Sequence, residues 1–274
     1  MTFLEAIWKS IILGTVQGLT EFLPVSSSGH LSLLQRVLGY NMQGASMTFV
    51  NVMLHLGTLL PVIWIFRRDI FDLFKKPFQT LLMLIVATIP AGLVGVLFND
   101  KIDALFAGER GIAALAICFS VTAFLLLLCE YVAKKRRKTQ PLGWKHASAM
   151  GLMQAVALFP GISRSGSTIV AGTVSGAKPE DVAKFSFLMS IPIILGSVAV
   201  ELKDVIFPEA GMTVAMGGAE IVGMIFGVVF AAISGFIAVK MMLKVIRKAN
   251  YKWFAVYLVL LSMTCIWLDV LQIF

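Results

Sequence analysis

Charged side chains are scarce in this chain. Only 14% of its 274 residues are Asp, Glu, Lys or Arg, whereas soluble domains carry roughly 25%. Hydrophobic residues make up 58%, and the apolar runs are far longer than the roughly 9–11 residues of a membrane barrel strand. These features exclude a soluble protein and predict an all-α integral membrane protein.

Cysteine is also rare, and the N-terminal sequence does not resemble a targeting signal. Cys118, Cys129 and Cys265 lie in apolar runs without metal-ligand spacing, so we expect neither a disulfide nor a metal site from them. The N-terminus lacks a basic leader and a cleavage site, so we expect no cleavable signal peptide. The net charge of +8 comes from basic residues beside the apolar runs, where they set membrane orientation. We therefore expect no nucleic-acid partner.

Polar residues gather in two related stretches within the apolar sequence. Residues 14–30 read GTVQGLTEFLPVSSSGH and residues 151–167 read GLMQAVALFPGISRSGS. At a constant offset of 137 residues, six positions are identical, pairing Gly14 with Gly151, Gln17 with Gln154, Phe22 with Phe159, Ser26 with Ser163, Ser28 with Ser165 and Gly29 with Gly166. Two positions differ in chemistry: Ser27 corresponds to Arg164, and Glu21 corresponds to Leu158. The chain is therefore an internal repeat whose copies have specialised.

Each polar stretch interrupts what would otherwise be one helix. Pro24 with three serines, and Pro160 with Gly161, predict a helix, a non-helical turn and a second helix. Such a break at membrane depth is tolerated only where it is buried in protein or lines a wet cavity. We expect one membrane domain over 1–274, with re-entrant helical hairpins at 3–37 and 146–176. Six transmembrane helices are predicted at about 48–66, 79–98, 111–131, 183–202, 219–239 and 253–272.

The distribution of basic residues tests this layout. If each hairpin returns to its starting side, the loops 67–78, 132–147 and 240–252 share one side of the membrane, and these are the basic loops. The loops 99–110 and 203–218 lie opposite and are poor in Lys and Arg. The positive-inside rule then places both termini outside the cell. Repeat one (about 1–131) and repeat two (about 146–274) become inverted-topology repeats, whose broken helices meet near the middle of the membrane.

The second stretch has the chemistry of an anion site. Ser and Gly at a helix break expose backbone N–H groups that bind phosphate. Arg164 adds a planar fork that holds phosphate oxygens, and hydroxyl groups surround it at Ser163, Ser165 and Thr168. These residues are the predicted phosphate-binding set, together with Ser26 and Ser28 of the first stretch.

The first stretch supplies acid, base and nucleophile chemistry. His30 can transfer protons near neutral pH or act as a nucleophile, and Ser27 is the alternative nucleophile, which His30 can activate. Gln17 and Glu21 are four residues apart on one helical face. Their oxygens can bind a divalent cation, Mg²⁺ or Ca²⁺, that neutralises a pyrophosphate.

Structural interpretations compete with these roles. Gln17 and Glu21 can simply pair with neighbouring helices, and a lone membrane histidine such as His30 is more often packed than catalytic. Arg164 alone can be an orientation charge. The functional interpretation rests on two related breaks that carry complementary groups. Three other polar residues have no acid, base or anion-binding groups near them in the sequence. We therefore expect structural roles for His55, His146 and Glu130.

At these residues the chain resembles the bacterial undecaprenyl pyrophosphate phosphatase family, which is associated with bacitracin resistance. The family's first motif corresponds to Gln17, Glu21, Pro24-Val25-Ser26-Ser27 and Gly29-His30, where Gln17 is the neutral option at a Glu-or-Gln position. Its second motif, Pro-Gly-x-Ser-Arg-Ser-x-x-Thr, corresponds to residues 160–168. Both motifs match at full length.

The resemblance implies hydrolysis of undecaprenyl pyrophosphate to undecaprenyl phosphate and inorganic phosphate, which recycles a lipid carrier for wall polymers. It implies a divalent cation, a bacterial plasma-membrane location and an active site open to the outer face. The functional positions it implies are Glu21, Ser27, His30, Arg164 and Thr168, with Ser163 and Ser165 beside them. The expected partners are the polyprenyl pyrophosphate and membrane lipids, and a homodimer stays open.

Transport is the rival interpretation. A polyprenyl-phosphate flippase built from inverted repeats would use the same anion site at the middle of the membrane. It would not need His30 and Glu21 beside the serines, which favours the enzyme. A structural membrane scaffold is a third and weaker alternative, because it needs no such polar constellation.

Overall fold

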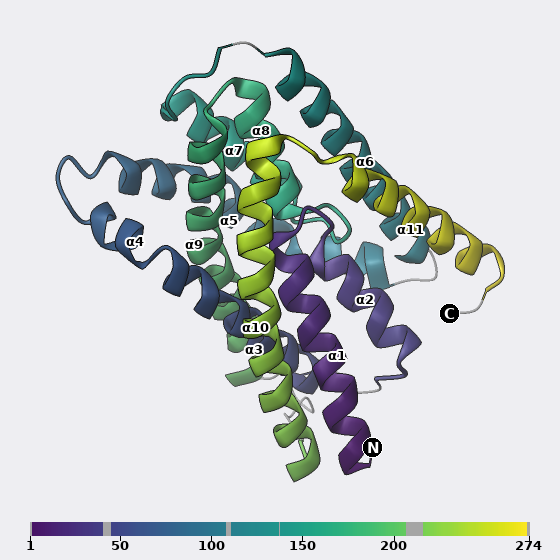
Figure 1. The fold of residues 1–274 in the computed structure, drawn as a ribbon. Helices are drawn as coiled ribbons and strands as arrows, with labels where there is room; N and C mark the ends of the chain where they lie inside the picture. Colours follow the sequence, from purple (N-terminus) through teal and green to yellow (C-terminus); the bar gives the residue numbers. More distant parts are fainter. Residues whose placement is uncertain (1, 41–44, 108–110, 137, 207–215, 273–274) are drawn as a thin grey trace.

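The computed structural model describes residues 2–40, 45–107, 111–136, 138–206 and 216–272. Within these ranges every regular element is a helix, apart from one isolated bridge between Gln140 and Ala177 (Figure 1). Six helices are long and apolar enough to cross a membrane. They are α3 (Ala45–Ile65), α5 (Gln79–Ala107), α6 (Gly111–Lys135), α9 (Pro179–Ile206), α10 (Gly218–Lys248) and α11 (Lys252–Val270). The six predicted spans are therefore confirmed.

The two predicted breaks are also confirmed as helix–turn–helix pairs. Helix α1 (Phe3–Phe22) ends just before Pro24 and α2 (Ser27–Val37) follows the turn. In the second repeat, α7 (Trp144–Val156) and α8 (Arg164–Ser175) flank a turn that contains Pro160. Each turn therefore places its serines at the beginning of a new helix.

Several segments that were predicted as loops are partly helical. Helix α4 (Arg67–Leu73) forms inside the basic loop 67–78, α5 continues to Ala107, and α10 continues to Lys248. The prediction was wrong there because hydropathy marks where the apolar run ends, whereas lysine, arginine and aspartate allow a helix to continue beyond it. The predicted loops 99–110 and 203–218 include residues 108–110 and 207–215, which lie outside the described residues.

Helix α1 packs closely along α10 (Figure 1). A Cβ atom on Gly14 would lie 2.0 Å from the backbone oxygen of Gly227, and one on Gly18 would lie 2.3 Å from the oxygen of Ala231. Small residues of this kind let two membrane helices approach backbone to backbone. The position of Gln17 and Glu21, on the same helix, therefore depends on this contact.

Glu130 has a structural role, as predicted. Its carboxylate accepts hydrogen bonds from the backbone N–H groups of Tyr251 and Lys252, both at 2.7 Å, and from Nζ of Lys134 at 2.5 Å. Two of the otherwise unpaired N–H groups at the beginning of α11 thus gain a charged acceptor. This carboxylate joins the end of α6 to the beginning of α11.

Candidate active site

The turns of the two hairpins lie against each other and are joined by three polar contacts. Nη2 of Arg164 donates to Oε1 of Glu21 at 2.5 Å. The backbone N–H of Gly161 donates to Oγ of Ser26 at 3.1 Å, and Oγ of Ser165 donates to the carbonyl of Leu23 at 3.0 Å. Residues about 140 positions apart in sequence therefore form one site.

Glu21 is the centre of this site. Its side chain is buried, and its second oxygen, Oε2, accepts hydrogen bonds from Oγ of Ser27 at 2.6 Å and from Nε2 of Gln17 at 3.1 Å. The predicted placement of Gln17 and Glu21 on one helical face is confirmed. A carboxylate with three donors in a low-dielectric surrounding is strongly held in place.

His55 also contacts the carboxylate of Glu21. Its Nε2 lies 3.8 Å from Oε2 of Glu21, and its Nδ1 donates to the carbonyl of Asn51 at 2.8 Å. We expected a structural role for His55 because no acid or base group is near it in the sequence, and that expectation is wrong. The sequence analysis missed this contact because His55 lies on α3, outside both motifs. An ionisable residue within a predicted span was the signal that could have found it.

Arg164 has a free donor group. It is the first residue of α8, and while Nη2 pairs with Glu21, its Nη1 is buried with no hydrogen-bond partner among the described residues. A buried unpaired guanidinium nitrogen is costly. An anion bound beside Arg164 would satisfy it.

A small cavity of about 50 Å³ lies at this junction. Its lining consists of Thr20, Glu21, Ser26, Ser27, Ser28, Ala157, Ile162, Ser163 and Arg164. The first residues of α2 and of α8 both belong to this lining, so two helix N-termini, each with a partial positive charge, end at the same cavity. Two such termini and a guanidinium give this cavity the chemistry that suits an anion.

In each turn a serine is the N-cap residue of the helix that follows. Ser26 has a φ of 70°, a left-handed conformation that costs free energy for a residue other than glycine and is concentrated at functional sites. Ser163 caps α8 through a hydrogen bond from the N–H of Gly166 to its Oγ at 3.1 Å. The N–H of Ser163 in turn donates to Oγ1 of Thr122 at 3.2 Å, so α6 supports this turn.

His30 and Thr168 do not line the cavity. Nδ1 of His30 donates to the carbonyl of Ser26 at 2.7 Å, so its Nε2 is the acceptor of the hydroxyl of Tyr257 at 2.6 Å. The rings of His30 and Tyr257 also stack, with centroids 5.6 Å apart. Thr168 is fully buried, and its hydroxyl is bonded to that of Ser186 at 2.7 Å. The structure thus pairs Ser27 with Glu21 rather than with His30.

Known proteins are similar to this chain over most of its length. The family described as bacitracin resistance protein BacA matches residues 10–264, which include both turns. The chain belongs to this family. It is 40% identical over 258 residues to an undecaprenyl-diphosphatase of Carboxydothermus hydrogenoformans, with 94% of this chain and 95% of the relative covered. An undecaprenyl-diphosphatase of Halothermothrix orenii is 41% identical over 254 residues, with 92% and 93% covered. Undecaprenyl-diphosphatase 4 of Bacillus thuringiensis is 38% identical over 278 residues, with 100% of this chain and 100% of the relative covered.

The divalent cation implied by resemblance to the BacA family can be tested against the residues present. Among the described residues there is no cluster of three His, Cys, Asp or Glu side chains. Oε1 of Gln17 is nevertheless buried without a partner, beside the carboxylate of Glu21. One carboxylate and one amide oxygen suit Mg²⁺ or Ca²⁺ when substrate phosphates supply further ligands. The pair therefore fits a cation that is shared with the substrate.

Tyr257 and Thr122 are further site residues that the sequence analysis missed. Tyr257 lies 227 positions beyond His30, on α11, and Thr122 lies on α6. Neither stands in a motif, and both are isolated polar residues within apolar spans. Their roles depend on which helices pack together.

Proposed function

We propose that this member of the BacA family hydrolyses undecaprenyl pyrophosphate to undecaprenyl phosphate and inorganic phosphate. The observation that carries the proposal is the joint position of Glu21, Ser27 and Arg164 at a cavity where two helix N-termini end. A nucleophile, a base and an anion-binding group are then within reach of one phosphoryl group. The relatives in Carboxydothermus hydrogenoformans and Halothermothrix orenii are named undecaprenyl-diphosphatase, which agrees with hydrolysis.

Arg164 and the two helix N-termini bind the pyrophosphate. The unpaired Nη1 of Arg164 and the N–H groups at the beginning of α2 donate to oxygens of the terminal phosphoryl group. Charge that develops on these oxygens in the transition state is stabilised by donors that are already in place. Ser163 and Ser165 hold the second turn, so their contribution is positional.

Ser27 and Glu21 carry the bond-making step in this proposal. The hydroxyl of Ser27 already donates to Glu21, so the carboxylate takes its proton as Oγ attacks the terminal phosphorus. The P–O bond to the bridging oxygen breaks, and undecaprenyl phosphate leaves. Water then attacks the phosphoserine and the bond between Oγ of Ser27 and phosphorus breaks. Glu21 returns its proton to Oγ, and inorganic phosphate leaves with both hydrogens of the water. A cation at Glu21 and Gln17 would supply positive charge for the pyrophosphate.

The test is inorganic phosphate release from a long-chain polyprenyl pyrophosphate by purified protein in detergent. We expect wild-type release that EDTA abolishes and Mg²⁺ or Ca²⁺ restores. Ser27→Ala should lower the rate by several orders of magnitude, since the loss of an activated serine nucleophile in a triad enzyme costs up to about 10⁶-fold. Ser32→Ala is the matched control, because Ser32 lies further along α2 and outside the cavity lining. If both variants fold and Ser27→Ala releases phosphate as fast as Ser32→Ala, Ser27 is not the nucleophile.

Tyr257 positions His30, whose Nδ1 holds the carbonyl of Ser26 and with it the turn that presents Ser27. Its hydroxyl fixes the ring and leaves the proton on Nδ1. We expect Tyr257→Phe to lower kcat about three- to tenfold with an unchanged KM, since one neutral hydrogen bond contributes about 1 kcal/mol. Tyr131→Phe, which removes the hydroxyl of an exposed tyrosine on α6, should leave kcat unchanged. A KM effect in place of a kcat effect would assign Tyr257 to substrate binding instead.

The membrane arrangement is part of the same proposal. Helices α2 and α8 have 11 and 12 residues, which at about 1.5 Å per residue is about 16–18 Å, well short of a hydrocarbon core of about 30 Å. This length supports two re-entrant hairpins that meet inside the membrane, in inverted repeats. The basic loops then face the cytoplasm, the termini lie outside, and the site opens to the outer face.

A further inference from the structure

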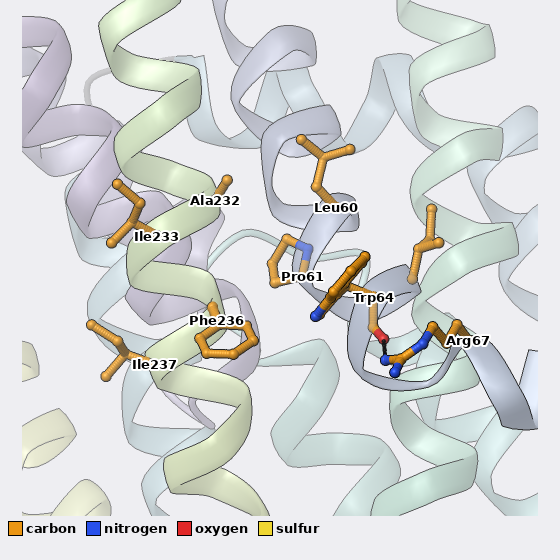
Figure 2. Close-up of a pocket in the computed structure, with 9 residues that line it drawn as sticks. Leu60, Pro61, Trp64, Arg67, Ala232, Ile233, Phe236 and Ile237 are labelled. Atoms are coloured by element: carbon orange, nitrogen blue, oxygen red, sulfur yellow. Dashed lines mark hydrogen bonds between the residues drawn. The ribbon is translucent and has the colours of Figure 1, made fainter.

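A second concave site lies away from the catalytic cavity, on the outer surface of the bundle between α3 and α10. Leu60, Pro61, Ile63 and Trp64 form one wall, and Ala232, Ile233, Phe236 and Ile237 form the other, with Arg67 at one end (Figure 2). The groove has a volume of about 600 Å³, and apart from Arg67 its lining side chains are apolar. None of the proposed catalytic residues lines it.

Two cations lie over aromatic rings of the groove lining. Arg67 marks one end of the groove, and Lys240 follows Phe236 by about one turn of α10, which places it beyond the lining residues of that wall. The guanidinium of Arg67 lies 4.9 Å from the ring centroid of Trp64, and its Nη1 donates to the carbonyl of Trp64 at 2.8 Å. Nζ of Lys240 lies 4.2 Å from the ring centroid of Phe236 on the opposite wall. In the part of the chain that the structure describes, neither cation has an acidic partner within 4.0 Å.

This combination specifies the chemistry of the occupant. The apolar walls suit an acyl chain that runs along the groove, and any membrane lipid would offer one. The two cations at one end have no acidic partner, so the occupant should carry a negative charge where the apolar walls end. Basic pockets between membrane helices on the side of the basic loops are suited to acidic lipid head groups. A Trp at this level is typical of the membrane–water interface.

We infer that the groove between α3 and α10 binds one anionic phospholipid, with its phosphate at Arg67 and Lys240 and an acyl chain against Trp64 and Phe236. The lipid comes from the leaflet that contacts the basic loops. Its place in the fold also brings it near the first hairpin: Pro61 of the groove packs against Gly235, and so does Phe22, the neighbour of Glu21. The bound lipid thus supports the packing of α3 and α10 behind the catalytic turn.

The test compares two lipids by native mass spectrometry of the intact protein released from neutral detergent. Phosphatidylglycerol and phosphatidylcholine with identical acyl chains are the probes. We expect one phosphatidylglycerol retained at about tenfold lower concentration than phosphatidylcholine, since each basic residue near the surface favours an acidic lipid. The variant Arg67→Gln/Lys240→Gln should lose this preference. Ala232→Trp, which fills the groove and keeps both charges, should lose retention of either lipid at this site.

A charge-matched control separates this site from general attraction. Lys135→Gln/Lys252→Gln removes two positive charges that also lie over aromatic rings, those of Tyr131 and Trp253, away from the groove. This variant should keep the preference, and thermal melting should show all variants folded. Equal retention of both lipids by the wild type, or loss of preference in the control variant as well, would overturn the inference. A Leu60→Cys disulfide dimer formed in the membrane would assign the groove to a second copy of the chain instead.

Discussion

Phosphate release by Arg164→Ala is expected to fall by about 10²–10³-fold or more relative to wild type. Arg164 supplies the free Nη1 donor at the cavity, and removing one preorganised donor of this kind typically costs that factor. The variant also leaves the buried carboxylate of Glu21 without its cationic partner. Breaking a buried ion pair from one side costs about 3–5 kcal/mol, so a lower melting temperature should accompany the loss of activity.

A double variant separates the two effects. Arg164→Met/Glu21→Gln removes both charges at similar volume, which is often neutral for stability. We expect its melting temperature to return close to that of wild type while phosphate release stays at or below the rate of Arg164→Ala. Recovery of activity together with stability would show that neither Arg164 nor Glu21 acts in the chemical step, and it would overturn the proposed mechanism. The same comparison with Arg36→Ala, at the end of α2 and outside the cavity lining, controls for loss of a positive charge.

Replacing Gly14 by alanine is expected to destabilise the whole protein. The added Cβ would lie 2.0 Å from the backbone oxygen of Gly227, and backbone atoms cannot turn away as a flexible side chain can. Overpacking typically costs about 1–3 kcal/mol, and we expect this backbone contact to lie at the upper end of that range. Because α1 carries Glu21, displacement of α1 from α10 should also lower the rate of phosphate release.

Gly92 provides the matched control for this substitution. It lies within α5, and a Cβ there would meet no heavy atom within 4 Å. Gly92→Ala should therefore keep the wild-type melting temperature or raise it slightly, because alanine favours the helix by about 1 kcal/mol. Equal melting temperatures for Gly14→Ala and Gly92→Ala would show that α1 and α10 can separate without cost.

Much of the fold could be predicted because it depends on local sequence. The six spans follow from apolar runs, and the two breaks follow from Pro24 and Pro160 beside serines and glycines. The pairing of Gln17 with Glu21 follows from their spacing on one helix. The ends of α5 and α10 were missed, since charged residues end an apolar run without ending a helix.

The contacts of the site were predictable only where the internal repeat indicated them. The 137-residue offset placed Arg164 opposite the first motif, and the structure joins it to Glu21. The partners of His30 and the approach of His55 to Glu21 depend on which faces of α11 and α3 turn inward. Hydropathy carries little information about such faces, because these helices are apolar nearly all round.

The ion pair at the centre of the site has a consequence for biosynthesis. Glu21 and Arg164 are 143 positions apart, and translation at about 5–20 residues per second leaves about 7–30 seconds between them. During that interval the first hairpin exists without its countercharge. The donors available within the first half are the hydroxyl of Ser27 and the amide of Gln17, with His55 close by. The newly made first half therefore holds the carboxylate through its own polar side chains, and arrival of the second half adds the guanidinium and closes the site on which the proposed chemistry depends.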